Sequence, residues 1–110
     1  MKFKTKKENG IMDVRFEKGT LDASNSDEFK NAILPVLAEN EKIALDLSKI
    51  SFVDSSGCGA LLSCLRNLAA KEGELKLYGV QKPVRTLFEL VRMHRVVDIL
   101  NTREEALQSF

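Results

Sequence analysis

The residues best placed to do chemistry are the four at positions 54–57, with the sequence Asp-Ser-Ser-Gly. An apolar, strand-like stretch at 43–47 precedes them, and a leucine-rich, helix-like stretch at 61–68 follows. Two hydroxyls and a carboxylate therefore sit at a predicted strand-to-helix junction, where the first helical N–H groups lack partners and can hold a phosphate. With few bases nearby, we favour a serine that accepts a phosphate and thereby controls a partner.

The same residues also fit an ordinary helix cap, and both interpretations remain open at this point. Under the phosphate interpretation, Asp54 holds the loop, and phosphorylation adds about −1.5 to −2 charges at the helix start. The helix dipole offsets part of that charge while Asp54 opposes it. We therefore expect phosphorylation to change partner binding without unfolding the domain.

An enzymatic role finds little support in the sequence. A nucleophile elbow around Ser56 needs glycine two residues before and two after it, but Asp54 and Cys58 stand there. His94 is the single histidine, and nothing in the pattern links it to a serine. The segment 57–59 lacks the third glycine of a dinucleotide fingerprint. We expect neither catalysis nor a cofactor.

Composition narrows the class further. The chain has 110 residues and a net charge of +1, which indicates one domain over 1–110 and argues against direct nucleic-acid binding. Cys58 and Cys64 diverge by about 240° around one predicted helix, so we expect reduced cysteines and no metal site. The sequence shows no signal region or membrane span, which favours the cytoplasm.

The elements that must position the motif follow from hydrophobic periodicity. Strands are predicted at 2–7, 11–18, 43–47, 74–78 and 96–100, with a hairpin turn at Asn9-Gly10 and Asp13 on the polar face of the second strand. Helices are predicted near 25–37, 56–71 and 84–91, with a short terminal helix capped by Thr102 and Glu105. Pro35 should kink the first helix or end it early.

Most predicted strands are apolar on one face only. Helices should then cover one side of the sheet and leave the other side wet. Right-handed crossovers keep helices on one side when successive strands are added in one direction. We therefore predict an α/β architecture with a hairpin followed by sequential βα units, without a central nucleotide crevice.

The chain resembles a known family, the bacterial anti-sigma-factor antagonists built on the sulfate transporter and anti-sigma antagonist (STAS) domain. The matching residues are Gly19-x-Leu21-Asp22-Ala23, Leu45-Asp46-Leu47-Ser48, Phe52-Val53-Asp54-Ser55-Ser56-Gly57-x-Gly59-Ala60-Leu61, the segment 73–79 and Val84-x-x-Leu87-Phe88. The resemblance implies the STAS fold, a mixed, mainly parallel sheet of four to five strands with an N-terminal antiparallel hairpin and helices mainly on one face.

The resemblance also implies partner switching. The unphosphorylated antagonist binds an anti-sigma factor that is also a serine kinase, and so releases the sigma factor. The kinase phosphorylates the antagonist, binding ends, and a serine phosphatase restores the active form. The resemblance implies no catalytic residue, metal or cofactor.

By position in the motif, the resemblance assigns the phosphoacceptor to Ser56, with Ser55 as the alternative. Asp54 would orient the loop, Asp22 would lie near the same docking surface, and Ser55 and Gly57 would also belong to the partner-binding loop. The alternative function is a non-switching STAS subunit of a transport or signalling complex.

Overall fold

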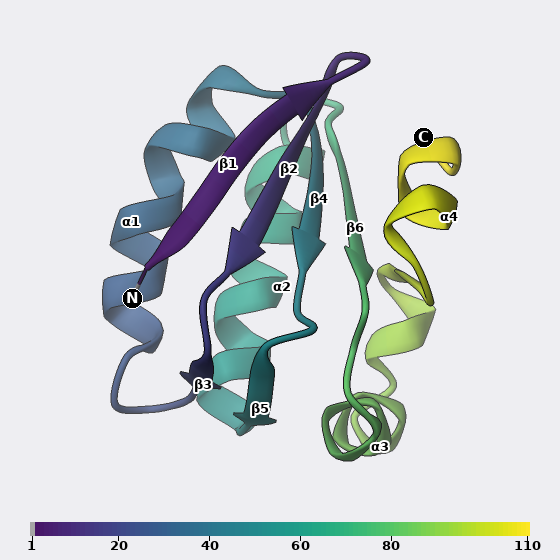
Figure 1. The fold of residues 1–110 in the computed structure, drawn as a ribbon. Coiled ribbons are helices and arrows are strands. Elements are labelled where there is room, and N and C mark those ends of the chain that lie inside the picture. Colours follow the sequence, from purple (N-terminus) through teal and green to yellow (C-terminus); the bar gives the residue numbers. More distant parts are fainter. Residues whose placement is uncertain (1) are drawn as a thin grey trace.

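The computed structural model describes residues 2–110, and a five-stranded sheet forms its centre (Figure 1). Its strands are β1 (Phe3–Glu8), β2 (Ile11–Phe16), β4 (Lys42–Asp46), β6 (Glu74–Tyr78) and β7 (Asp98–Leu100), in that spatial order. β1 and β2 form an antiparallel hairpin, and every other neighbouring pair is parallel. The predicted α/β class, the hairpin and the sequential strand order are confirmed.

A second, two-stranded sheet is not among the predicted elements. β3 (Gly19–Leu21) and β5 (Ile50–Val53) pair in parallel below the main sheet in Figure 1. The two strands are too short, at three and four residues, to show a clear alternation of apolar and polar positions. Their pairing matters for the site, because β3 leads to Asp22 and β5 leads to Asp54.

Two helices cover one face of the main sheet, α1 (Ser26–Glu39) and α2 (Ser55–Ala69). α1 continues through Pro35 to Glu39, so the expectation of an early end is wrong. Proline lacks the N–H that bonds to the preceding turn but fits the helical φ, and tertiary packing here outweighs the lost bond. Phe29, Ile33 and Leu37 of this helix are fully buried in the core.

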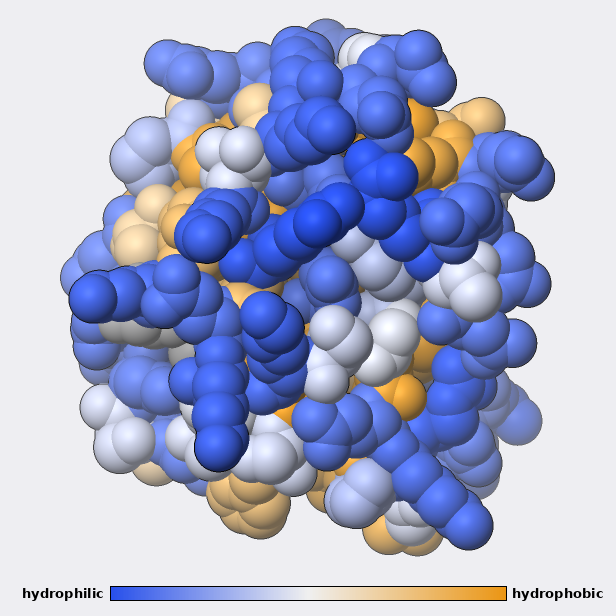
Figure 2. Space-filling model, viewed as in Figure 1, coloured by the Kyte–Doolittle hydropathy of each residue, from blue (hydrophilic) through white to orange (hydrophobic). Residues whose placement is uncertain are grey.

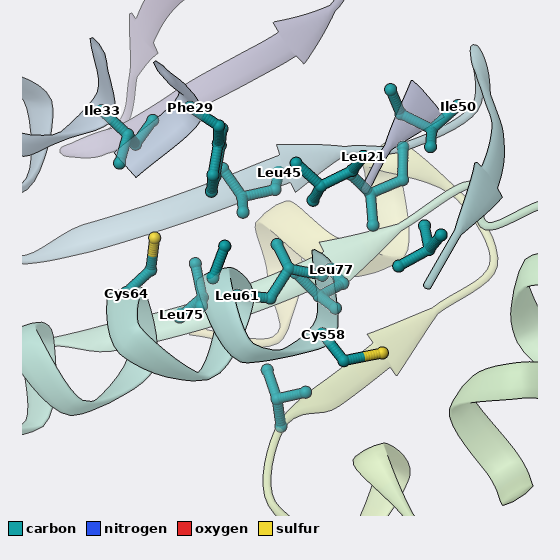
Figure 3. Packing of buried hydrophobic residues seen from close by; sticks show 14 of the residues in the cluster. Leu21, Phe29, Ile33, Leu45, Ile50, Cys58, Leu61, Cys64, Leu75 and Leu77 are labelled. Atoms are coloured by element: carbon teal, nitrogen blue, oxygen red, sulfur yellow. The ribbon is translucent and has the colours of Figure 1, made fainter. Parts of the chain in front are cut away.

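The main core lies between this helical layer and the sheet, as Figure 3 shows. Leu61 and Cys64 of α2 point toward Leu45 and Leu75 of the sheet, and all four are buried. α3 (Lys82–Leu90) adds Val84 and Phe88 to the same core. The start of α2 is thus held by packing along the rest of the helix.

The short helix α4 (Arg103–Gln108) packs over the opposite face of the sheet, where its Ala106 joins a small cluster with Ala44 and Tyr78. Its capping box of Thr102 and Glu105 is confirmed. Asp13 points to this face as predicted, but the expectation of a wet position is wrong. Its side chain is fully buried. The rest of this face, including β1 in front, is mainly hydrophilic (Figure 2).

Polar partners compensate the buried Asp13 carboxylate. It accepts hydrogen bonds from the Tyr78 hydroxyl at 2.7 Å, from Arg103 Nε at 2.9 Å and from Arg15 Nε at 3.1 Å. Arg103 also pairs with Glu8 at 2.6 Å. This network ties α4 to the hairpin and to β6.

Candidate functional site

Asp54 is the residue that holds the predicted site together. It is the N-cap of α2, with extended backbone, and its Oδ1 accepts a hydrogen bond from the Gly57 N–H at 2.9 Å. Its Oδ2 accepts from the Ala23 N–H at 3.0 Å, across 31 positions of sequence. One carboxylate therefore performs both roles: Oδ1 caps α2, and Oδ2 holds the loop that contains Ala23.

Ser55 and Ser56 are the first two residues of α2, and both are exposed. Of the first-turn amides, the Gly57 N–H is taken by the Asp54 side chain and the Cys58 N–H by the Asp54 carbonyl at 3.0 Å. The N–H groups of the two serines come before the first intrahelical bond. Both hydroxyls thus stand in water beside open backbone donors, at the positive end of the helix dipole.

Close packing around Gly57 explains why the motif ends on glycine. A Cβ at this position would lie 2.1 Å from the Leu21 carbonyl oxygen and 2.8 Å from Val53 Cγ1. Only a residue without a side chain lets α2 approach β3 and β5 so closely. Gly57 is buried, so it positions the loop rather than offering a surface to a partner.

Asp22 lies in the loop that Asp54 holds through Ala23. Its carboxylate accepts hydrogen bonds from the Ser24 hydroxyl and N–H and, at 2.9 Å, from the Thr20 hydroxyl. These bonds, led by the Ser24 hydroxyl, lower the pKa of Asp22 and keep it ionised. The structure thus brings Asp22, Asp54 and both serines to one end of the molecule.

Asn25 also stabilises this loop. The sequence pattern indicated only that Asn25 could lie at the start of a helix. It stands at the N-cap of α1 but makes no side-chain cap. Instead, its amide donates to the Thr20 carbonyl at 2.7 Å, and its Oδ1 accepts from the Asp22 N–H at 3.0 Å. Asn25 therefore fixes the backbone on which Asp22 sits.

A groove of about 500 Å³ opens beside the serines, and sequence patterns did not predict it. It runs between the start of α2 and the segment that follows α3. The lining residues are Ser55, Cys58, Gly59, Leu62, Val91, Arg92, Met93, Arg95 and Val96. The available signal was the apolar residues at 90, 91, 96 and 97, which continue past the end of α3.

A larger hollow of about 780 Å³ lies elsewhere and contains no residue of the motif 54–59. Its charged lining is mixed, with Lys4, Lys18 and Lys49 beside Glu17 and Asp46. The candidate site is the smaller groove, because Ser55 and Cys58 of the motif region line it.

The other reactive side chains do not form a centre. His94 is exposed on the 3₁₀ turn Met93–Arg95. Cys58 and Cys64 are free and buried, and burial raises the pKa of both thiols, to about 12 for Cys64. Within residues 2–110, no cluster of three or more His, Cys, Asp or Glu side chains is arranged to hold a metal ion.

No helix within residues 2–110 combines the length and apolar character needed to cross a membrane. The surface of the candidate site is built from the first two turns of α2 and the segment that follows α3.

Comparisons with known proteins agree with this architecture. The sequence profile of the STAS domain matches residues 2–106. An anti-sigma-B factor antagonist of Listeria monocytogenes is 32% identical over 92 residues, covering 82% of this chain and 80% of the relative.

Solved structures show the same fold. A crystal structure from Thermotoga maritima, described as a candidate anti-sigma factor antagonist, superposes with a TM-score of 0.88 at 23% identity, covering 96% of this chain and 92% of the other. The phosphorylated form of the Bacillus cell fate determinant SpoIIAA superposes with a TM-score of 0.71 at 22% identity, covering 97% of each chain.

Proposed function

The chain belongs to the STAS-domain family, and from this premise we propose that it is an anti-sigma factor antagonist, a regulatory binding protein rather than an enzyme. The unphosphorylated form binds an anti-sigma factor that carries serine kinase activity and so releases the sigma factor. Phosphorylation at the start of α2 ends that binding, and a serine phosphatase reverses it. The exchange takes place in the cytoplasm.

The observation that carries this proposal is the pair of hydrogen bonds that the Asp54 carboxylate accepts from the Gly57 and Ala23 N–H groups. It holds two exposed serine hydroxyls in one rigid place while leaving them free to react. A kinase needs an accessible hydroxyl in a defined position, because effective transfer depends on holding the reacting atoms in line. If Asp54 served only as a helix cap, its second hydrogen bond, to the loop at Ala23, would not be needed.

The groove bears on which serine is the acceptor. The motif position led us to expect Ser56, with Ser55 as the alternative. Ser55 lines the groove beside the apolar segment, and Ser56 leaves the helix about 100° further around its axis. A kinase docked on the groove reaches Ser55 first. We therefore propose Ser55 as the phosphoacceptor and retain Ser56 as the alternative.

Phosphorylation at either serine changes the surface more than the fold. The phosphate adds about −1.5 to −2 charges next to the open amides of the helix start, which favour a negative group. Asp54 lies beside it and adds a second negative centre. A partner that fits two neutral hydroxyls then meets a concentrated negative charge, and its binding weakens.

The test uses purified protein and each anti-sigma factor of the source organism that carries a serine kinase domain. Calorimetric titration without ATP measures binding, and mass spectrometry of the tryptic peptide 50–66 after incubation with MgATP locates the phosphate. We expect one anti-sigma factor to bind, one phosphate on Ser55, and about 100-fold weaker binding afterwards, or about 2.7 kcal/mol.

Ser55→Ala and Ser56→Ala are the matched variants. Under the proposal, Ser55→Ala binds but is not phosphorylated, and Ser56→Ala behaves as the unmodified protein. Phosphate on Ser56 alone would restore the motif-based assignment. Failure of every anti-sigma factor to bind would contradict the proposed function and favour a non-switching STAS subunit.

A further inference from the structure

We propose that the groove beside Ser55 receives an apolar side chain of the anti-sigma factor flanked by acidic side chains, and that Arg92 and Arg95 select that partner. This inference rests on the proposed function and deepens it by naming the chemistry of the partner. Ser55 lines the groove together with both arginines, so the partner surface and the phosphorylation site are continuous.

The first support is the distribution of exposed apolar side chains. Within residues 2–110, five large hydrophobic residues are exposed: Val91 and Val96 line the groove, Leu90 is the last residue of α3, and Phe52 lies on β5. The fifth, Leu34, lies on α1. Hydrophobic surface also shows at the lower edge of Figure 2, the end where β5 and α3 lie in Figure 1. Two exposed apolar side chains in one groove favour an interaction surface, whereas scattered apolar residues need no explanation.

The groove also has a formed floor. Cys58 and Met93 line it and are 5% and 2% exposed, so the core supports them from below. Gly59 lines one wall, and a Cβ there would meet no atom within 4 Å. The volume of about 500 Å³ falls in the range of about 300–1,000 Å³ typical of ligand pockets. An apolar anchor with its neighbouring atoms fits this space, as in a binding hot spot.

The charge of the groove rim indicates which side chains should flank the apolar anchor of the partner. The residues that line the groove include Arg92 and Arg95 but no carboxylate. Both arginines are exposed, and neither forms an ion pair or side-chain hydrogen bond to any of residues 2–110. Free guanidinium groups on the rim of an apolar groove favour acidic side chains around the apolar anchor.

The experiment compares matched charge and shape variants against the anti-sigma factor that binds the unmodified protein. The double variant R92Q/R95Q removes both rim cations, and K6Q/K7Q removes two exposed cations from β1. G59L fills the groove from an open helix position, and G59A adds only the Cβ. We expect R92Q/R95Q to bind about 10-fold more weakly at low salt, with the difference shrinking at high salt.

The remaining expected results test the groove itself. G59L should bind at least about 10-fold more weakly, because a blocked pocket excludes the anchor. K6Q/K7Q should bind as the unmodified protein does, G59A should weaken binding less than G59L does, and circular dichroism should show all four variants folded. Unchanged binding by R92Q/R95Q and G59L would overturn the inference. If phosphorylation still abolished binding in those variants, the proposed function would stand without it. Binding by no anti-sigma factor would overturn both.

Discussion

At the scale of single residues, Asp54 links two properties that a switch needs, rigidity and exposure. Its two oxygens serve the α2 amide of Gly57 and the loop amide of Ala23. The carboxylate therefore fixes the backbone on both sides of the serines without covering their hydroxyls. A neutral cap of the same shape would hold one amide, and the loop of Asp22 would then lose its side-chain hydrogen bond to the start of the helix.

We predict that Asp54→Ala lowers the free energy of unfolding by about 2 kcal/mol, because both amides lose a charged acceptor. Thr102→Ala is the matched control, since Thr102 caps α4 and no residue of α4 lines the groove, and it should cost about 1 kcal/mol. Urea unfolding measures both values. Only Asp54→Ala should also weaken anti-sigma factor binding, and equal binding by the two variants would count against the loop-holding role.

Asp22 offers a residue-scale test by titration. Hydrogen bonds from Ser24 and Thr20 lower the pKa of its carboxyl below the ordinary value of 3.8. A depressed folded-state pKa means that its stabilising effect is present above about pH 3.8 and is lost as pH falls through the folded value. We predict that Ser24→Ala raises the pKa of Asp22 back toward 3.8, as followed by carbon NMR of the carboxyl group. An unchanged midpoint in Ser24→Ala would contradict this account.

At the scale of elements, the site depends on how closely α2 approaches the two-stranded sheet. β3 and β5 bring Leu21 and Val53 beside the first turn of the helix, and Gly57 leaves room for both. The Asp54 N–H also donates to the Leu21 carbonyl at 3.3 Å. The two short strands are thus the support for the loop, although they lie outside the main sheet.

Gly57→Ala should destabilise the domain by about 3 kcal/mol, since a methyl group 2.1 Å from a backbone oxygen forces the helix and strand apart. Gly59→Ala, two residues along the same helix, meets no atom and should stabilise by up to about 1 kcal/mol through helix propensity. Thermal unfolding of the two variants makes the comparison. Equal melting temperatures would rule out the close approach.

At the scale of the whole molecule, α4 covers part of the sheet face that lies opposite α1 and α2. The Asp13 carboxylate lies beneath it, with Tyr78, Arg15 and Arg103 as partners drawn from β6, β2 and α4. A buried carboxylate is tolerated only when paired and hydrogen-bonded. This network therefore joins the two ends of the chain and stabilises the fold at a distance from the groove.

The single tyrosine of the chain reports on this network. Burial, and then the hydrogen bond to Asp13, raise the pKa of Tyr78 above its ordinary value of 10.0. A raised folded-state pKa means that stability is retained below about pH 10 and falls as pH rises above it. We predict that tyrosinate absorbance and loss of circular dichroism appear together above that pH.

Tyr78→Phe is the control for the alkaline transition. It should lose about 1.5–3 kcal/mol at neutral pH, because the buried Asp13 carboxylate loses a donor. Its remaining stability should then fall less steeply above pH 10 than that of the unmodified protein. Formation of tyrosinate in the folded protein near its ordinary pKa would contradict the buried network.

Much of the secondary structure and its order could be predicted from the sequence. The hairpin at Asn9-Gly10 and the capping box of α4 were predicted because they depend on neighbours a few positions apart. The sequential order of the parallel strands followed from strands that are apolar on one face, combined with the right-handed crossover rule. The acidic cap before two serines likewise identified the start of α2. Of the two effects predicted for Pro35, the early end is wrong, since α1 continues to Glu39 and buries Phe29, Ile33 and Leu37.

Only the tertiary structure decided the features that join distant segments. The second bond of Asp54 to Ala23, the burial of Asp13 under α4 and the groove between α2 and residues 91–96 all unite parts of the chain separated by tens of residues. Local periodicity carries no information about such pairs. The sequence by itself determined the family, the order of elements and the position of the Asp-Ser-Ser-Gly motif at the start of a helix. The tertiary fold decided which hydroxyl faces the groove, because that depends on how α2 is rotated against its neighbours.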